Sequence, residues 1–396
     1  MVAVIGDPLL QKLMQLRSTD AAIRRVDNWL MAFFEDQLQS PNQAEGNILS
    51  MLSAVLQYAH YTKTLPSACF LYLKAMAVDW NGITGREVIL ALLAYTPISS
   101  FTELQAAIFQ ALEEAVLDGS VDSQIVLLDF YNDLLRQWST AMLAANEHTD
   151  AHSDAIKSLI NHASLLSLVI LQASSSVAAY SRILDFYETA GFVGSQPSLV
   201  SLRCIVVPPS TIIYTLSFTH SINILSRLCG MLAVYKQALE AATKVRPYDK
   251  ASVNRFNGLI MDICNCLWRD RAFNTNDPNA NGCLIPPQTL PGLTSYVASL
   301  NTPLELTSLF NLSCAPPIAL LSISYVREEE DKKVDEIELR HRGPPTQKSL
   351  AILARNRGIK LLWPDYRLGV LRYLERKGVE GITALMSNTM KHLMKK

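Results

Sequence analysis

The sequence predicts an all-α protein, organised as an irregular, HEAT-like α-solenoid. Apolar residues recur at helical spacing along most of the 396-residue chain. The segments with this pattern are separated by short loops, as expected for antiparallel helix neighbours. Strands do not alternate with helices, which argues against a parallel α/β sheet. Helix pairs that stack on one another bury their apolar faces without a cofactor, and this favours a solenoid.

The composition supports a folded chain with a large apolar interior. Apolar residues make up 49% of the chain and charged residues 18%, unlike the composition of a disordered protein. Seven scattered cysteines favour a reducing compartment over a disulfide framework. The N-terminus lacks a signal-peptide pattern, and the apolar run 165–171 is far shorter than the ~20 residues of a membrane span. We therefore expect a soluble intracellular protein with no membrane partner.

Several short motifs predict where helices begin and end in the first part of the chain. Asp7 followed by Pro8 is a typical helix start, because Asp caps the helix and Pro suits its first position. The sequences at 84–87 (TGRE) and 100–103 (SFTE) both match the capping box. Gly119 stands where a helix is expected to stop, and the next residues can cap the helix that follows.

The remaining elements follow from periodicity. Helices are predicted over 122–145, 153–173, 176–190, 210–242, 249–271, 364–377 and 379–394. The β-branched run 202–207 (LRCIVV) is the best strand candidate. The sequence LDFY occurs at 128–131 and again at 184–187, an offset longer than the usual helical repeat of about 40–47 residues. An irregular array is therefore favoured over a regular one.

Two interruptions suggest a domain organisation. Residues 274–291 are rich in Asn, Pro and Gly and predict a loop. Residues 327–345 are dense in charge and end in Gly-Pro-Pro, which indicates either a flexible excursion or a solvated helix that stops at Gly343. We therefore divide the chain into a helical array over 1–326, a charged linker over 327–345 and a basic helical cap over 346–396, packed on the array.

No motif in the sequence predicts catalysis. Neither a glycine-rich phosphate loop nor a GxSxG motif occurs. Cys264, Cys266 and Cys283 could suggest a metal site, but positions i and i+2 of a helix point apart, so packing near a core helix is favoured. His148 and His152 have a zinc-like spacing, but they lie in an expected loop. We predict a non-enzyme with no cofactor, no metal and no small-molecule substrate.

The distribution of charge provides the candidate functional site. The net charge is −1, but residues 1–326 contain 19 basic and 26 acidic residues, residues 327–338 three and seven, and residues 339–396 13 and three. Because the C-terminal cations alternate with apolar residues, this basic segment is expected to be folded. The candidate patch consists of seven of its cations: Arg355, Arg357, Lys360, Arg367, Arg372, Arg376 and Lys377.

Three interpretations of this patch compete. The simplest is a solvated helix face that balances the acidic remainder of the chain or docks against the acidic run 328–338. The second is a surface for an acidic protein partner. The third is contact with the phosphate backbone of nucleic acid, which the predominance of arginine favours.

Four segments resemble the centromere protein I family of inner kinetochore subunits. FTELQAAIFQALEEAV (101–116) and IVLLDFYNDLLRQWS (125–139) resemble the middle of family sequences. FNGLIMDICNCLWRDRAF (256–273) is similar to a later family signature, and WPDYRLGVLRYLERKGVEGITALMSNTMKHL (363–393) is similar to the C-terminal helix pair. Family members are longer, and this chain resembles their middle and C-terminal part.

The resemblance implies a non-catalytic helical scaffold of the constitutive inner kinetochore, located in the nucleus at the centromere. It implies assembly with centromere proteins H, K and M, and a link between centromeric chromatin and other centromere proteins. It also strengthens the interpretation of the basic segment as a contact with DNA or a nucleosome. The alternative is a helical-repeat transport or trafficking adaptor that binds protein cargo.

Overall fold

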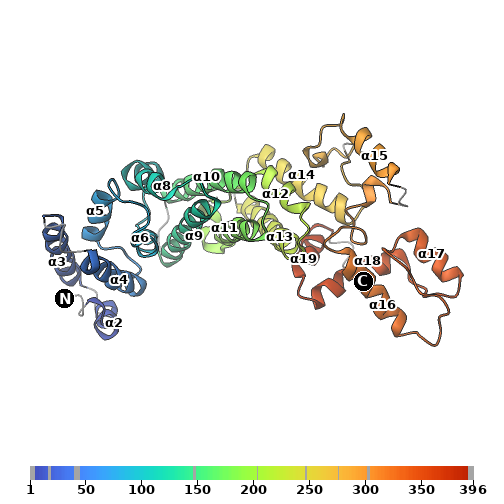
Figure 1. Cartoon of the computed structure of the whole chain (residues 1–396), viewed down its shortest axis with the longest axis horizontal. Helices are drawn as coiled ribbons and strands as arrows, with labels where there is room; N and C mark the ends of the chain where they lie inside the picture. The colour runs from blue at the N-terminus through green and yellow to red at the C-terminus, as the bar shows by residue number, and fades with distance from the viewer. Residues whose placement is uncertain are drawn as a thin grey trace. The chain divides into compact units, whose positions relative to one another are not determined.

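The computed structural model describes residues 5–16, 19–39, 45–145, 149–202, 204–245, 248–274, 276–300 and 304–390. Over these ranges the backbone forms helices joined by turns, with no β-strand and one isolated bridge between Leu339 and Gly358. Figure 1 shows the helices following one another along the chain. The all-α prediction is therefore confirmed, and the succession of helices is consistent with an α-solenoid. The HEAT-like repeat type stays a prediction.

The chain divides into two compact units, Met1–Val206 and Val207–Lys396. The sequence-based division at residues 326/327 stays a prediction, but the structure shows how that segment is built. Helix α16 (Ala319–Asp331) continues through residues 326 and 327 without a break. The charged segment 327–345 therefore begins inside helix α16 and continues as turns. The helix ends at Asp331, well before Gly343.

The first unit is built from helices of very different length. Its α-helices are α2 (Pro8–Leu16), α3 (Asp20–Gln39), α4 (Glu45–Thr62), α5 (Ser67–Met76), α6 (Arg86–Leu93), α7 (Phe101–Leu104), α8 (Gln110–Val116), α9 (Val121–Ala144), α10 (Asp150–Ala173) and α11 (Val177–Ser195). A π-helix, η2 (Gln105–Phe109), joins α7 to α8, and a 3-10 helix, η3 (Pro197–Leu202), follows α11.

Most of the predicted helix starts in this unit are confirmed. The Asp7 carboxylate accepts a hydrogen bond of 2.8 Å from the Leu9 N–H at the start of α2. The Ser100 hydroxyl caps α7, and the Ser120 hydroxyl caps α9. Gly119 precedes that cap with a φ of 84°, a conformation that glycine adopts without strain.

The capping box predicted at 84–87 is wrong. The residue before α6 is Gly85, in the left-handed conformation with a φ of 67°, and it offers no side chain. The Thr84 hydroxyl is used elsewhere, because it accepts a hydrogen bond from the Asn81 side-chain amide at 3.0 Å. Asn81 in turn accepts from the Ile83 and Thr84 N–H groups at 2.9 Å. A local Asn-centred turn therefore replaces the capping box.

The centre of the first unit is a group of three long helices. Helix α9 packs against both α10 and α11. The leucine, phenylalanine and tyrosine of the two LDFY sequences, 128–131 on α9 and 184–187 on α11, are all buried. Trp138 on α9 is also buried, and its indole N–H donates to the Thr96 carbonyl at 2.8 Å. The repeated sequence thus marks two core helices that face each other.

A polar network links α8, α9 and α10 beside this core. The Glu113 carboxylate accepts hydrogen bonds from the Tyr131 hydroxyl, from Gln105 at 3.2 Å and from His162 Nε2 at 2.6 Å. Burial alone would raise the pKa of Glu113, but the hydrogen bonds from His162, Tyr131 and Gln105 outweigh burial and leave the pKa lowered. The ionised carboxylate is therefore the form that this packing stabilises.

Helix α10 is the one helix of the described chain with the length and apolar character to cross a membrane. Half of its most apolar window is buried inside the unit, where the helix packs against α9 and α11. Such burial is typical of a core helix.

The second unit begins with a helix pair where one long helix was expected. Its α-helices are α12 (Ser210–Ser217), α13 (Ile222–Val245), α14 (Lys250–Leu267), α15 (Leu290–Ser299), α16, α17 (Gln347–Arg355), α18 (Trp363–Arg376) and α19 (Glu380–Thr389). Two 3-10 helices, η4 (Gly282–Leu284) and η5 (Leu306–Ser308), lie in the connections.

The predicted single helix over 210–242 is wrong, because the chain breaks between α12 and α13. The Thr219 hydroxyl accepts from the Ser221 N–H at 3.2 Å, and the Ser221 hydroxyl accepts from the Ile224 N–H at 3.5 Å. Such local side-chain hydrogen bonds compete with helix continuation. The helix predicted over 249–271 ends earlier, at Leu267. The helix predicted over 379–394 is described as α19, and residues beyond 390 lie outside the described chain.

The strand candidate at 202–207 is also wrong over the residues that the structure describes. Leu202 ends η3, and residues 204–207 belong to no helix or strand. Cys204 is buried there, so the apolar character of this run reflects core contact. Arg203 lies outside the described residues.

Helices α13 and α19 cross at very close range. The crossing is made by small residues, because a Cβ atom on Gly381 would overlap the Ser226 carbonyl oxygen and lie 2.8 Å from the Gly230 nitrogen. The Gly381 N–H donates to the Ser226 hydroxyl at 3.1 Å. At the other end of α19, Lys236 donates to the Asn388 carbonyl at 2.7 Å. The C-terminal helix is therefore fixed to α13 at both ends.

Over its described residues, the predicted loop 274–291 is confirmed up to the start of α15, apart from the short 3-10 helix η4, and one buried carboxylate holds it. Asp262 on α14 is 2% exposed. It accepts hydrogen bonds from the N–H groups of Asn281 at 3.1 Å, Gly282 at 3.0 Å and Cys283 at 3.2 Å. The Tyr214 hydroxyl donates to the same carboxylate at 2.5 Å. Asp262 thus joins α12, α14 and the loop.

Candidate functional site

The basic segment is positioned by the packing of α18 on α16. Gly369 on α18 lies directly against Tyr325 on α16, since a Cβ atom there would overlap the tyrosine hydroxyl. The Tyr325 ring is 6.1 Å from the Tyr366 ring and 5.9 Å from the Tyr373 ring, measured between centroids. This aromatic contact brings the acidic end of α16 beside the basic end of α18.

Helix α17 is fixed at its start by a capping box. The Ser349 N–H donates to the Thr346 hydroxyl at 3.0 Å, and the Thr346 N–H donates to the Ser349 hydroxyl at 2.8 Å. Leu350 and Leu353 are the buried side chains of this helix. The rest of its surface is free to carry charge.

Three of the seven candidate cations pair with the acidic run 328–338. Glu328 lies 3.4 Å from Arg376 Nη2 and 4.0 Å from Lys377 Nζ, measured from its carboxylate oxygens. Glu338 lies 2.5 Å from Arg357 Nη1. A fourth pair, Asp331 with Arg340 at 2.9 Å, extends the contact to a cation outside the candidate patch. The simplest of the three interpretations, docking against the acidic run, therefore applies to Arg357, Arg376 and Lys377.

These ion pairs are exposed. Every side chain in the four pairs is at least 39% exposed. Exposed pairs contribute about 0–1 kcal/mol each and are screened by salt. They therefore add little to the stability of the fold, and a stronger anion can replace the carboxylates.

Arg367 does not belong to a surface patch. Its guanidinium lies 4.5 Å from the Trp268 ring centroid and 5.6 Å from that of Trp363. Nη1 also donates to the Trp268 carbonyl at 2.6 Å. Partial burial lowers the pKa of Arg367, while nearby Asp270 opposes that shift. The residue joins the end of α14 to α18, a role that its sequence position did not reveal.

The three remaining candidate cations are free. Arg355, Lys360 and Arg372 are exposed, and none of them has an ion-pair partner within the described residues. Lys348, two turns before Arg355 on the same face of α17, is likewise exposed and unpaired. The candidate patch therefore divides into paired cations, one structural arginine and free cations.

A buried carboxylate that sequence inspection missed fixes the turn between α16 and α17. Glu330 is fully buried, and one of its carboxylate oxygens accepts from the His341 N–H at 2.6 Å. The His341 ring bonds Ser349 at 2.8 Å, and burial lowers the pKa of this histidine while Glu330 opposes the shift. Glu330 stands among identical neighbours in a charged run, so no sequence signal separates it from them.

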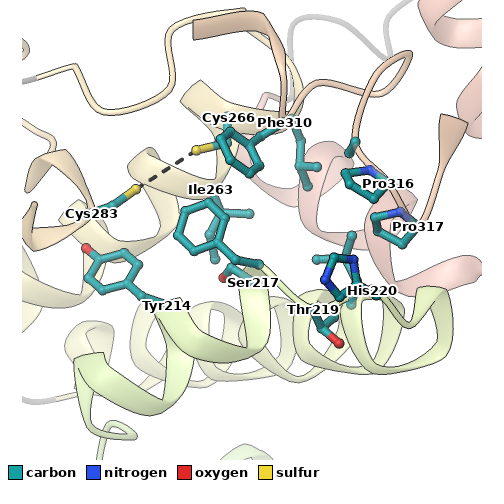
Figure 2. A pocket seen from close by; sticks show the side chains of 14 residues that line it. Tyr214, Ser217, Thr219, His220, Ile263, Cys266, Cys283, Phe310, Pro316 and Pro317 are labelled. Carbon is teal, nitrogen blue, oxygen red and sulfur yellow. Dashed lines mark hydrogen bonds between the residues drawn. The ribbon is translucent and has the colours of Figure 1, made fainter. Parts of the chain in front are cut away.

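A small cavity lies in the second unit, and Ser217, Thr219 and His220 are among its lining residues (Figure 2). It has a volume of about 80 Å³ and lies between α12, α14 and residues 310–317. Its lining is mainly apolar and includes Ile263, Phe310 and Pro316. The Tyr214 hydroxyl at its edge is already bonded to Asp262. Because most of its lining is apolar, we interpret this cavity as a packing feature of the core.

The three cysteines considered as a metal site are core residues, as expected. Cys264, Cys266 and Cys283 are free thiols and are buried. Burial raises the pKa of Cys264 to about 11, while the Sγ atoms of Cys266 and Cys283 lie 4.0 Å apart (Figure 2). No group of three His, Cys, Asp or Glu side chains suited to a metal ion occurs in the described part of the chain. His148, the partner considered for His152, lies outside it.

Comparison with known proteins finds similarity to one family model and to relatives that share one name. The family described as CENP-I: Mis6 matches residues 1–156. Centromere protein I of Rattus norvegicus is 25% identical over 328 residues, which cover 76% of this chain and 43% of that protein. The Mus musculus protein of the same name is 23% identical over 329 residues, with the same coverage of both chains. That of Gallus gallus is 23% identical over 332 residues, again covering 76% of this chain and 43% of its own length.

The family match includes two of the four segments singled out in the sequence. The segments 101–116 and 125–139 lie within the part matched by the family. The matched 76% of this chain is longer than either structural unit. The similarity to the curated relatives therefore includes parts of both units. The chain spans less than half the length of those relatives. The chain is therefore similar to the CENP-I family, through its first 156 residues to the family model and over 76% of its length to centromere protein I of three vertebrates.

Proposed function

We propose that the chain is a non-catalytic helical scaffold of the inner kinetochore, located in the nucleus at centromeres. Its similarity to centromere protein I over 76% of its length carries this proposal. The all-α architecture supports it, because packed helices present extended surfaces to several partners. The proposed partners are centromere proteins H, K and M, and the proposed role is to link them to centromeric chromatin.

The titratable clusters of the fold support a non-catalytic role. Glu113 is bonded to side chains of neighbouring helices, and Asp262 is bonded to a tyrosine and three backbone N–H groups. Both carboxylates have structural partners, and Asp262 is closed off from solvent. Each therefore serves to join helices.

We further propose that the basic segment, residues 339–396, contacts chromatin by binding the phosphate groups of DNA. Between Leu339 and Pro364 the chain has six basic residues and no acidic residue. Four of these cations, Arg342, Lys348, Arg355 and Lys360, are exposed and unpaired within the described residues. Arginine and lysine contacts to phosphate are the main source of sequence-independent binding to DNA. This cation-rich stretch supports DNA over an uncharged partner.

Affinity purification of the tagged chain from nuclear extract tests the scaffold role. We expect recovery of centromere proteins H, K and M, identified by mass spectrometry, in nuclease-treated extract. Recovery of cargo or membrane-coat proteins in their place would support a trafficking adaptor and contradict the proposal.

Fluorescence anisotropy with a labelled DNA duplex tests the phosphate contact. We expect Arg355→Glu with Lys360→Glu to weaken binding about tenfold or more and to make the salt slope about two smaller. Arg24→Glu with Arg25→Glu is the matched control, because it changes the charge equally at exposed residues of α3. Equal losses for both double variants would show a net-charge effect and contradict a local contact.

A further inference from the structure

The acidic run 328–338 lies against the same basic segment that we propose to contact DNA. Its carboxylates pair with cations that are distant in sequence: Glu328 with Arg376 and Lys377, and Glu338 with Arg357. Asp331 pairs with Arg340 in the same way. Each of these cations would otherwise be available to a phosphate group.

The backbone of the acidic run is held by contacts that do not involve these carboxylates. The Glu338 N–H donates to the Arg357 carbonyl at 2.9 Å, and an isolated bridge joins Leu339 to Gly358. The buried Glu330 accepts from the His341 N–H. The exposed acids therefore remain near the cations whether or not each ion pair is formed.

Two of the paired cations, Arg376 and Lys377, are also held in place independently of the acids. The Arg376 guanidinium lies 5.4 Å from the Tyr373 ring centroid, and the Lys377 ammonium lies 5.2 Å from it. Contact with an aromatic face keeps a cation positioned and leaves it charged. Removal of the Glu328 charge therefore leaves two ordered cations without an anion.

We propose that the acidic run acts as an internal competitor for DNA at the basic segment. This inference depends on the proposed phosphate contact. When DNA binds, its phosphates replace Glu328, Asp331 and Glu338 beside their cations. No covalent change is needed, because exposed ion pairs are weak and duplex DNA has a much higher charge density than three carboxylates. The competitor lowers the affinity for DNA, and weak, non-specific DNA sites are therefore bound less.

A matched pair of variants in the full chain tests the proposal. Glu328→Gln with Glu338→Gln removes two paired carboxylates, while Asp335→Asn with Glu336→Gln removes two exposed carboxylates of the same run that have no ion-pair partner among the described residues. Both variants change the net charge by the same amount. We expect the first to bind a labelled DNA duplex about three- to tenfold more tightly than the unmodified chain, with a steeper salt dependence. We expect the second to change affinity by less than twofold.

The outcomes separate this inference from the proposed function. If the unmodified chain binds the duplex and both variants bind it equally well, the competitor is refuted while the phosphate contact stands. If none of the three chains binds the duplex, the phosphate contact and the competitor are both refuted. If a poly-glutamate peptide of equal charge binds more tightly than the duplex, the surface serves an acidic protein and the assignment to DNA is wrong. Unchanged unfolding midpoints in urea verify that both variants are folded.

Discussion

The change Arg367→Ala tests most sharply whether Arg367 is a structural residue or part of the DNA-binding surface. The Arg367 guanidinium contacts the rings of both Trp268 and Trp363 and donates to the Trp268 carbonyl. The change Arg367→Ala removes all three contacts at once. We therefore expect a loss of stability and no direct loss of DNA affinity.

The size of the effect follows from these contacts. A hydrogen bond from a charged donor contributes about 1.5–3 kcal/mol. A cation over an aromatic ring at a partly exposed site adds about 0.5–1 kcal/mol. Because Arg367 keeps some exposure to solvent, we take the lower part of the sum and expect Arg367→Ala to cost about 2–3 kcal/mol. For an m-value of about 2 kcal/mol/M, the unfolding midpoint in urea falls by about 1–1.5 M.

Urea unfolding followed by tryptophan fluorescence and by circular dichroism measures this effect. Arg367→Lys is the graded control, because lysine keeps the charge but loses the planar guanidinium that lies near both rings. We expect its loss to be about half that of alanine. An unchanged midpoint for Arg367→Ala, together with a loss of DNA affinity like that of Arg355→Glu, would place Arg367 on the binding surface and refute this assignment.

Three further changes probe the packing inside each of the two units. Gly381→Ala should cost about 1–3 kcal/mol in urea unfolding, because the new methyl group overlaps the Ser226 carbonyl, whereas Gly292→Ala has open space and should not destabilise. Asp262→Ala should cost about 3–5 kcal/mol and make residues 274–289 cleavable in limited proteolysis, since three N–H groups lose their acceptor; an intact loop would contradict this. Glu113→Gln should destabilise at neutral pH, because the lowered pKa of Glu113 gives stability that is present above its unfolded value of 4.5 and is lost as the pH falls through the folded pKa. The difference between the variant and the unmodified chain should therefore shrink in acid, and a constant difference from pH 7 to pH 3 would contradict it.

Local patterns in the sequence were enough to predict the fold class and most helices. Periodicity and caps located α9, α10 and α18 to within a few residues. The break between α12 and α13 was missed, because apolar spacing continues across Thr219 and Ser221 while their hydroxyl groups bond the backbone. Periodicity reports which face is buried and does not report where a side chain replaces a backbone hydrogen bond.

The candidate site was predicted as a segment, but its internal division was not. Charge counting identified the basic end and suggested the acidic run as one neighbour. It gave no means to separate Arg367, which contacts two tryptophans, from Arg372, which is exposed. The partner Trp268 is far from Arg367 in sequence, so only the packing of α18 near the end of α14 reveals the contact.

The central proposal is that this chain acts at the centromere, and chromatin immunoprecipitation with sequencing in its native cells tests that proposal most directly. The tagged protein is cross-linked, and the recovered DNA is compared with that recovered by a centromeric histone. We expect strong enrichment confined to the same centromeric regions. A uniform genomic profile, or a protein located outside the nucleus, would contradict the account.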